Sequence, residues 1–207
     1  MVAVPVAFAL AGSGTASDAP PQQVIESLAG NRQGLILGGV VVVAVAALVL
    51  WFGATLSWLV HVRDRESPVG LVVLAGSVVM VVFLMLDGVF QVAVAFLATQ
   101  PGPAAAAAVP ALFVLQNGIV MPGAFGFAAA VFLSAVGVAA LRRVFAAVWV
   151  GYLSIALAVL SVGGGWLGMS QLDGGGSSAL SFSPALGLTL ITVVSSVYLL
   201  RARPARS

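Results

Sequence analysis

Two long apolar runs, Leu35–Val60 and Val69–Leu97, constrain the fold of this chain more than any other feature. Each exceeds the roughly 18 residues that mark a candidate transmembrane helix. The chain is 61% hydrophobic and 7% charged, whereas a soluble domain carries roughly 25% charged residues. Such a composition cannot offer water an adequate surface. The sequence therefore predicts an all-α, polytopic membrane helix bundle.

The remaining apolar segments bring the predicted number of spans to about five. The region Ala104–Leu141 carries polar and helix-breaking residues, which favour a kinked or interrupted helix. These residues are Gln116, Asn117, Gly118, Pro122 and Gly123. Whether the region forms one kinked helix or two stays open. The further predicted spans are Ile119–Leu141, Val144–Val162 and Leu180–Leu200, and Gly163–Ser178 is predicted to be a loop.

The arginines are unevenly distributed among the predicted loops, and this orients the bundle. Those on one side are Arg63, Arg65, Arg142, Arg143, Arg201, Arg203 and Arg206. Arg32 alone falls on the other side. The positive-inside rule then places the N-terminus outside and the C-terminus in the cytoplasm. We expect a multi-pass protein of a bacterial cytoplasmic membrane.

Residues 1–34 are predicted to form an extracytoplasmic segment ahead of a bundle over 35–200 and a basic cytoplasmic tail over 201–207. Val2–Ala11 is apolar but reaches only ~15 Å as a helix, too short to cross a bilayer. It is a signal peptide, a re-entrant segment or an interfacial helix. Ala19–Gly30 places Val24, Ile25 and Leu28 on one face, as an amphipathic helix does, although a solvated linker fits equally well.

Missing residue types exclude several classes of function. The chain has no Cys, which excludes disulfides, a thiolate nucleophile and Cys-based metal sites. It contains one His, His61, and few acids, so we predict no metal site. All basic residues are Arg, and without Lys there is no Schiff base to a cofactor. We predict no cofactor, and no basic patch faces an aromatic platform that would bind nucleic acid.

Three segments resemble small actinobacterial integral membrane proteins of unknown function. They are Pro21–Arg32, Trp149–Ser154 and Leu199–Arg201. The resemblance covers the layout of most of the chain, and it implies a membrane location and a helical architecture. It transfers no activity and no functional residue.

Asp87 is the most costly residue in the predicted membrane segments, since its apolar run contains no Arg, Lys or His. A carboxylate at the bilayer centre costs on the order of 2.5 to 3.5 kcal/mol on insertion scales. Gln91 lies on the same helical face, and Gln116 and Asn117 enter the membrane at a similar depth. The sequence therefore predicts a polar pocket in the outer half of the bundle. The aromatic residues predicted to line it are Trp51, Phe83 and Phe90.

Two roles for this pocket remain open. As interhelical glue, such polar bridges contribute ~0.6 and up to ~2 kcal/mol. As a site, the pocket binds a lipid, a lipophilic small molecule, a membrane-protein partner or a second copy of the chain. One alternative is an intramembrane acid-catalysed enzyme of the terpenoid cyclase or isomerase type, with Asp87 as proton donor and Phe113 in the aromatic lining. Another is a small transporter. We predict non-enzymatic binding.

Overall fold

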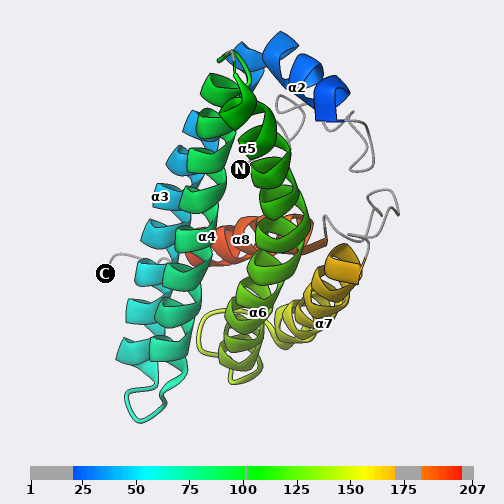
Figure 1. Cartoon of the computed structure of the whole chain (residues 1–207). Helices are drawn as coiled ribbons and strands as arrows, with labels where there is room; N and C mark the ends of the chain where they lie inside the picture. Colours follow the sequence, from blue (N-terminus) through cyan, green and yellow to red (C-terminus); the bar gives the residue numbers. More distant parts are fainter. Residues whose placement is uncertain (1–20, 101, 171–182, 202–207) are drawn as a thin grey trace.

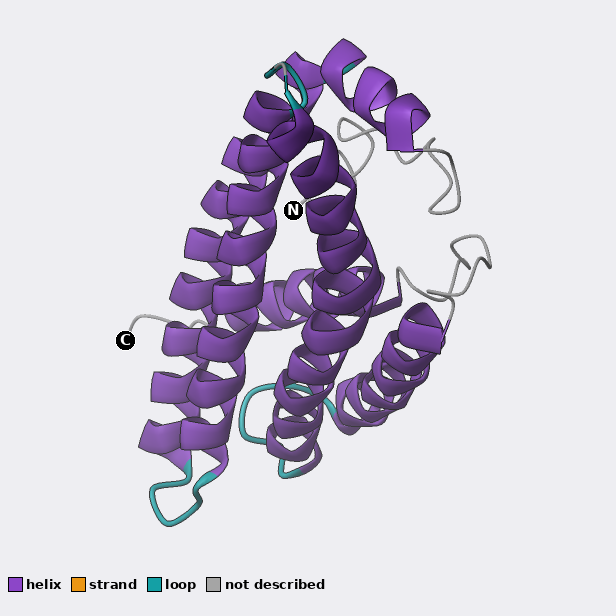
Figure 2. Ribbon diagram, in the orientation of Figure 1, coloured by secondary structure: helices purple, strands orange, loops and turns teal. Residues whose placement is uncertain are grey.

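The computed structural model describes residues 21–100, 102–170 and 183–201, and every regular element in these ranges is a helix (Figure 2). This confirms the all-α class. Residues 1–20 lie outside the described ranges, and with them the predicted segment Val2–Ala11. The elements in chain order are α2 (Pro21–Gly30), α3 (Arg32–Arg63), α4 (Val69–Leu97), α5 (Pro103–Val114), the π-helix η1 (Leu115–Ala124), α6 (Phe125–Leu141), α7 (Val148–Ser170) and α8 (Ser183–Arg201).

Helices α3 and α4 form a long antiparallel hairpin along one side of the molecule (Figure 1). Their 32 and 29 residues measure ~48 and ~43 Å. Small residues bring the two backbones close together, because a Cβ added to Gly39 would lie 2.7 Å from the carbonyl oxygen of Gly88. A Cβ on Gly53 would lie 2.3 Å from the side chain of Ser77. The hairpin thus packs through small residues, as membrane helices often do.

The region predicted to be kinked or interrupted is one continuous helical run, α5–η1–α6 (Figure 1). Its middle is π-helical over Leu115–Ala124, where the polar and helix-breaking residues lie. Pro122 has no N–H, and its ring crowds the carbonyl four residues earlier in a regular α-helix. A π-helix pairs each N–H with the carbonyl five residues back, and the N–H of Phe125 bonds to Val120 in this way. The local sequence is accommodated by a wider turn.

Helix α7 corrects two boundaries predicted from the sequence. It begins at Val148 rather than Val144, and it continues through Ser170. The predicted loop Gly163–Ser178 is therefore wrong for its first part, and residues 171–178 lie outside the described ranges. The physical reason is helix packing: a Cβ on Gly126 would lie 3.1 Å from the Cα of Gly165. Glycine there allows α6 and α7 to approach.

Helix α8 lies across the long helices, behind them in the view of Figure 1. It spans Ser183–Arg201, close to the predicted segment Leu180–Leu200. Its buried residues Leu188 and Ile191 belong to the main core, which also includes Phe132 and Leu133 of α6. Helix α8 therefore completes the bundle against α6 and α7.

A second, smaller core joins the short helix α2 to the end of the hairpin. Val24 and Leu28 of α2 are buried in it, together with Leu35, Val94 and Val109. The helix predicted within Ala19–Gly30 thus forms, with its apolar face turned inward. It caps the end of the molecule opposite the α3–α4 loop (Figure 1).

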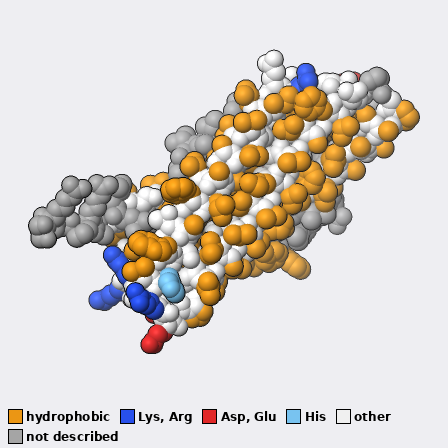
Figure 3. All heavy atoms as spheres, turned by 90° about the vertical axis from the view of Figure 1, so that its left-hand side faces the viewer, with side chains coloured by type: hydrophobic (Ala, Val, Ile, Leu, Met, Phe, Trp, Pro, Cys, Tyr) orange, Lys and Arg blue, Asp and Glu red, His pale blue; other side chains and the backbone are white. Residues whose placement is uncertain are grey.

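The surface of the hairpin is apolar between two ends that carry charge (Figure 3). Large apolar side chains exposed on it include Leu37, Leu48, Trp51, Trp58, Leu71 and Val89. Three helices are long and apolar enough to cross a membrane: Arg32–Arg63, Val69–Leu97 and Val148–Leu167. These features are compatible with a membrane-embedded protein.

Candidate functional site

Asp87 lies on the buried face of α4, at a position that is apolar elsewhere along the helix. Val73, Met80, Asp87 and Val94 follow one another at seven-residue spacing, and each is at most 1% exposed. Such a spacing keeps one helix face against its neighbours. The fold therefore requires this carboxyl group to be fully desolvated, with 0% of Asp87 exposed.

Two amide side chains satisfy the carboxyl group of Asp87. Gln91 Nε2 donates a hydrogen bond of 2.9 Å to Oδ2, and Gln116 Nε2 donates one of 2.6 Å to Oδ1. Gln91 is 3% exposed and Gln116 is 7% exposed. We call these three residues the polar triad. It joins α4 to η1 inside the protein, as the sequence predicts for Asp87, Gln91 and Gln116.

The two amides reach Asp87 for different reasons. Gln91 lies one helical turn further along α4, so it shares the face of Asp87 whatever the tertiary structure. Gln116 is the second residue of η1, and only the packing of η1 against α4 brings it within reach. The hydrogen bond from Gln116 is thus the tertiary contact of the site.

One polar atom of the triad has no hydrogen-bond partner among the described side chains. This atom is Oε1 of Gln91, which is buried. Buried acceptors without partners are rare in proteins, because their desolvation is not compensated. Asn117 was predicted to join the site, but its side chain lies outside the described part of the structure. The triad therefore presents an open acceptor, the Oε1 atom, beside a carboxyl group.

No ion pair involves Asp87 within the described ranges. The ion pair that the structure contains there joins Asp64 to Arg142, at the loop end of the hairpin. No group of three His, Asp or Glu side chains in the described ranges is placed to hold a metal ion. The chemistry available at the triad is consequently hydrogen bonding and interaction with a single positive charge or proton.

The aromatic residues predicted around the triad are dispersed. Trp51 on α3 is 78% exposed, so its ring lies on the outer surface rather than against Asp87. Phe83 is half-buried against the main core, and Phe113 packs with the smaller core. Phe90 is half-buried on α4. The prediction that Trp51 lines the pocket is therefore wrong, because its ring faces away from the polar triad.

The arginines at the two loops make contacts that their sequence pattern, which predicts only orientation, does not reveal. Arg63 donates a hydrogen bond to the carbonyl oxygen of Val144, and Arg142 donates one to Asp64. These contacts join loops that lie 78 and 81 positions apart in the chain. No local pattern in the sequence reveals such a pairing.

Comparisons of the chain with protein-family models, with curated proteins and with solved structures found no match. The resemblance to small actinobacterial membrane proteins stays a prediction.

Proposed function

We propose that this protein is a non-enzymatic membrane protein that binds a lipid or another lipophilic molecule at the polar triad. The ligand carries a hydrogen-bond donor, a hydroxyl or an ammonium group, on an apolar body. A membrane-protein partner or a second copy of the chain that offers such a donor within the bilayer is the alternative occupant.

The observation that carries this proposal is the open Oε1 acceptor of Gln91, buried beside Asp87. A carboxylate has about four lone-pair positions, and the two amides of the triad use two of them. Each amide of Gln91 and Gln116 uses one of its two N–H donors on Asp87, while Oε1 of Gln91 and lone pairs of the carboxyl group remain as acceptors. A ligand with a hydrogen-bond donor complements these acceptors.

The π-helix supports the same proposal. Ten residues of η1 depart from α-helical pairing, and π-turns are frequent at functional sites. Gln116 is the second residue of η1 and donates to Asp87, so the unusual backbone and the unusual carboxyl group are in direct contact.

We also propose the topology that the arginines predict. The bundle has about five spans in a bacterial cytoplasmic membrane, with the N-terminus outside and the C-terminus inside. Arg63, the last residue of α3, and Arg65 of the α3–α4 loop lie at the end where this loop meets the α6–α7 loop with Arg142 and Arg143, and this supports their placement on one side. Because α8 lies across the long helices in Figure 1, the fifth span is the part of this topology that most needs a test.

The enzyme and transporter hypotheses gain no specific contact from the fold. An acid-catalysed cyclase needs aromatic faces to stabilise a cation, and Trp51 lies on the outer surface. We therefore propose binding rather than catalysis or transport.

The test is photo-crosslinking of the full-length protein in native membranes with a diazirine-bearing hexadecanol. The matched control probe is the same diazirine-bearing alkyl compound without the hydroxyl group. We expect the alcohol to label α4 or η1, and the Asp87→Asn variant to lose about tenfold in labelling, equivalent to ~1.4 kcal/mol. Asp64→Asn makes the same chemical change far from the triad and should label like the wild type.

Thermal unfolding in detergent separates the two roles of the triad. A folded Asp87→Asn variant that has lost labelling supports the binding site. If labelling of the folded variant is unchanged while its unfolding temperature falls, the triad is interhelical glue and the proposal is wrong. Equal labelling by the two probes would also contradict it.

A further inference from the structure

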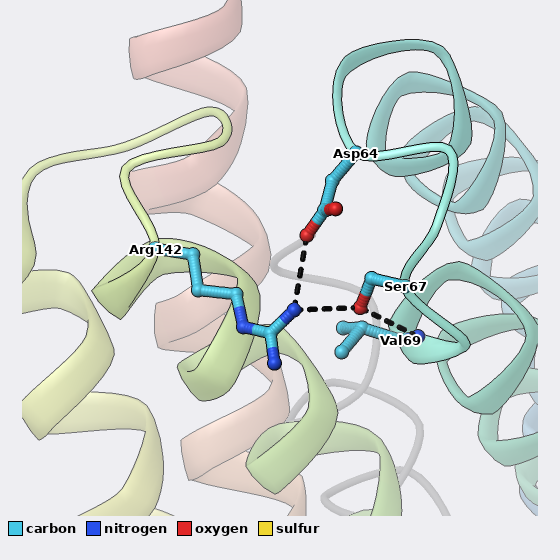
Figure 4. Close-up of polar contacts among 4 residues, drawn as sticks. All are labelled: Asp64, Ser67, Val69 and Arg142. Carbon is cyan, nitrogen blue, oxygen red and sulfur yellow. Dashed lines mark hydrogen bonds and ion pairs between the residues drawn. The ribbon is translucent and has the colours of Figure 1, made fainter.

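The end of the molecule formed by the α3–α4 and α6–α7 loops is held together by two arginines. Arg142 Nη1 donates hydrogen bonds of 3.0 Å to Oδ2 of Asp64 and 2.8 Å to Oγ of Ser67 (Figure 4). Arg63 crosses in the other direction and donates to the carbonyl of Val144. We call residues 61–68 and 142–147 the arginine end. Its two loops form one surface.

Two further arginines of this surface make no such contact within the described structure. Arg65 and Arg143 are both exposed. They flank the residues that join the loops, since Arg65 follows Asp64 and Arg143 follows Arg142. Because the 3.0 Å contact holds Asp64 against Arg142, the exposed residues Arg65 and Arg143 each lie next to the point where the two loops meet.

Arg143 occupies a backbone position that favours glycine. Its φ is 57°, and it is the non-glycine residue with positive φ in the described ranges. The N–H groups of Arg143 and Val144 bond to the carbonyls of Ala140 and Ala139, which is the Schellman pattern at a helix C-terminus. Glycine is the usual residue there because it lacks a Cβ. The chain places a cation where glycine would be less strained.

The charge of the arginine end is positive. Arg63, Arg65, Arg142 and Arg143 face the two acids Asp64 and Glu66, and Asp64 is paired with Arg142. Figure 3 shows basic side chains gathered at this end, with little charge along the apolar surface. At the opposite end Arg32 lies over the ring of Phe96, 5.2 Å from its centroid. Among the side chains that the structure describes, the arginines are thus concentrated at one end.

Aromatic side chains beside the arginine end indicate its position relative to the membrane surface. Trp58, on the turn of α3 before His61, is 65% exposed. Trp149, at the start of α7, is also exposed, and its Nε1 donates a hydrogen bond of 3.0 Å to the hydroxyl of Tyr198. Trp and Tyr collect at the headgroup level of membranes. The arginine end therefore lies where phospholipid phosphates lie.

We propose that the arginine end is a binding site for the phosphate of an anionic phospholipid headgroup, with Arg65 and Arg143 as its donors. Guanidinium groups bind phosphate oxygens in pairs of parallel hydrogen bonds. Arg63 and Arg142 position the two loops, and Glu66 limits the affinity by repulsion. Basic surfaces next to membrane helices attract anionic lipids in this way. This site is separate from the polar triad.

The test measures thermal unfolding of the full-length protein in detergent with added phosphatidylglycerol, phosphatidylcholine or inorganic phosphate. We expect phosphatidylglycerol to raise the unfolding temperature of the wild type more than the other two do. Arg65→Gln and Arg143→Gln should each weaken the apparent lipid affinity about fivefold. Arg32→Gln removes the same charge at the other end and should leave the lipid response unchanged.

The Arg143→Gly variant separates lipid binding from folding. Glycine relieves the strained backbone, so this variant should be at least as stable as the wild type without lipid. Its apparent affinity for phosphatidylglycerol should nevertheless fall about fivefold, as in Arg143→Gln. An equal response from phosphatidylcholine, or loss of the response in Arg32→Gln to the same extent, would overturn the proposal. So would reproduction of the effect by inorganic phosphate, because the site would then bind the free ion.

Discussion

Gln116 and Asp87, 29 positions apart in the chain, are joined by a hydrogen bond of 2.6 Å between Nε2 and Oδ1. The bond connects the π-helix to the buried face of α4. Both side chains are almost completely desolvated. The loss of Gln116 therefore leaves Oδ1 of Asp87 without its donor, and the loss of Asp87 leaves Nε2 of Gln116 without this acceptor. This pair therefore determines how the site responds to substitution.

The Gln116→Leu variant should be destabilised by about 1 to 3 kcal/mol, because Oδ1 of Asp87 would then be buried without its donor. Thermal unfolding of the purified protein in detergent measures the change. Gln100→Leu makes the same substitution at an exposed position and should alter stability by less than about 0.5 kcal/mol. A Gln116→Leu variant as stable as this control would show that the bond contributes nothing.

Replacing all three members of the polar triad by leucine should recover the stability that Gln116→Leu loses. Removing both partners of a buried polar contact leaves no uncompensated group, and Asp87 occupies a position equivalent to Val73 and Met80. The triple variant should also lose labelling by the hexadecanol probe. A triple variant less stable than Gln116→Leu would instead make the triad a requirement of the fold.

Substitution of Gly39 by alanine should separate α3 from α4. The new Cβ would lie 2.7 Å from the carbonyl oxygen of Gly88, a backbone atom that cannot move aside without shifting α4. We expect a loss of about 1 to 3 kcal/mol in unfolding free energy. Gly163→Ala is the matched control, because nothing lies within 4 Å of its added Cβ. Similar unfolding temperatures for the two variants would contradict this packing.

Single cysteines can map the topology directly, since the natural chain has none. Glu66→Cys, in the α3–α4 loop, should react with a membrane-impermeant maleimide only after the cells are opened. Gln100→Cys, at the opposite end of α4, should react in intact cells. These two residues are exposed in the structure. The reverse pattern would invert the proposed orientation.

The same reagent tests the fifth span through Arg206→Cys. If α8 crosses the membrane, this cysteine should be protected in intact cells, as in Glu66→Cys. Labelling of Arg206→Cys in intact cells would show that α8 does not cross. Blue-native electrophoresis of each variant checks that the protein remains assembled.

The long helices and the contact between Asp87 and Gln91 could be predicted because their causes are local. An apolar run longer than a bilayer is thick predicts a helix, and α4 has the predicted bounds Val69 and Leu97. Asp87 and Gln91 share a face because they are four residues apart. Pro122 and its polar neighbours predicted a kinked or interrupted helix in the third apolar region, whereas the structure has a continuous helix with a π-helical middle.

The extent of α7 and the orientation of Trp51 were predicted wrongly, because both depend on which residues pack against them. Gly163, Gly164 and Gly165 look like a loop in isolation, but they lie within α7, and Gly165 is in close approach to Gly126. Trp51 was predicted to line a pocket, and its side of α3 faces outward.

The sequence by itself determined that this chain forms apolar helices, which of them carries a buried carboxyl group, and at which end the arginines collect. Only the tertiary structure decided that Gln116 meets Asp87 and that Arg142 meets Asp64. The physical reason is that hydrophobicity and helical periodicity act within a few turns of the chain. Which faces come together depends on close approaches such as Gly39 to Gly88, which become defined only when the helices pack.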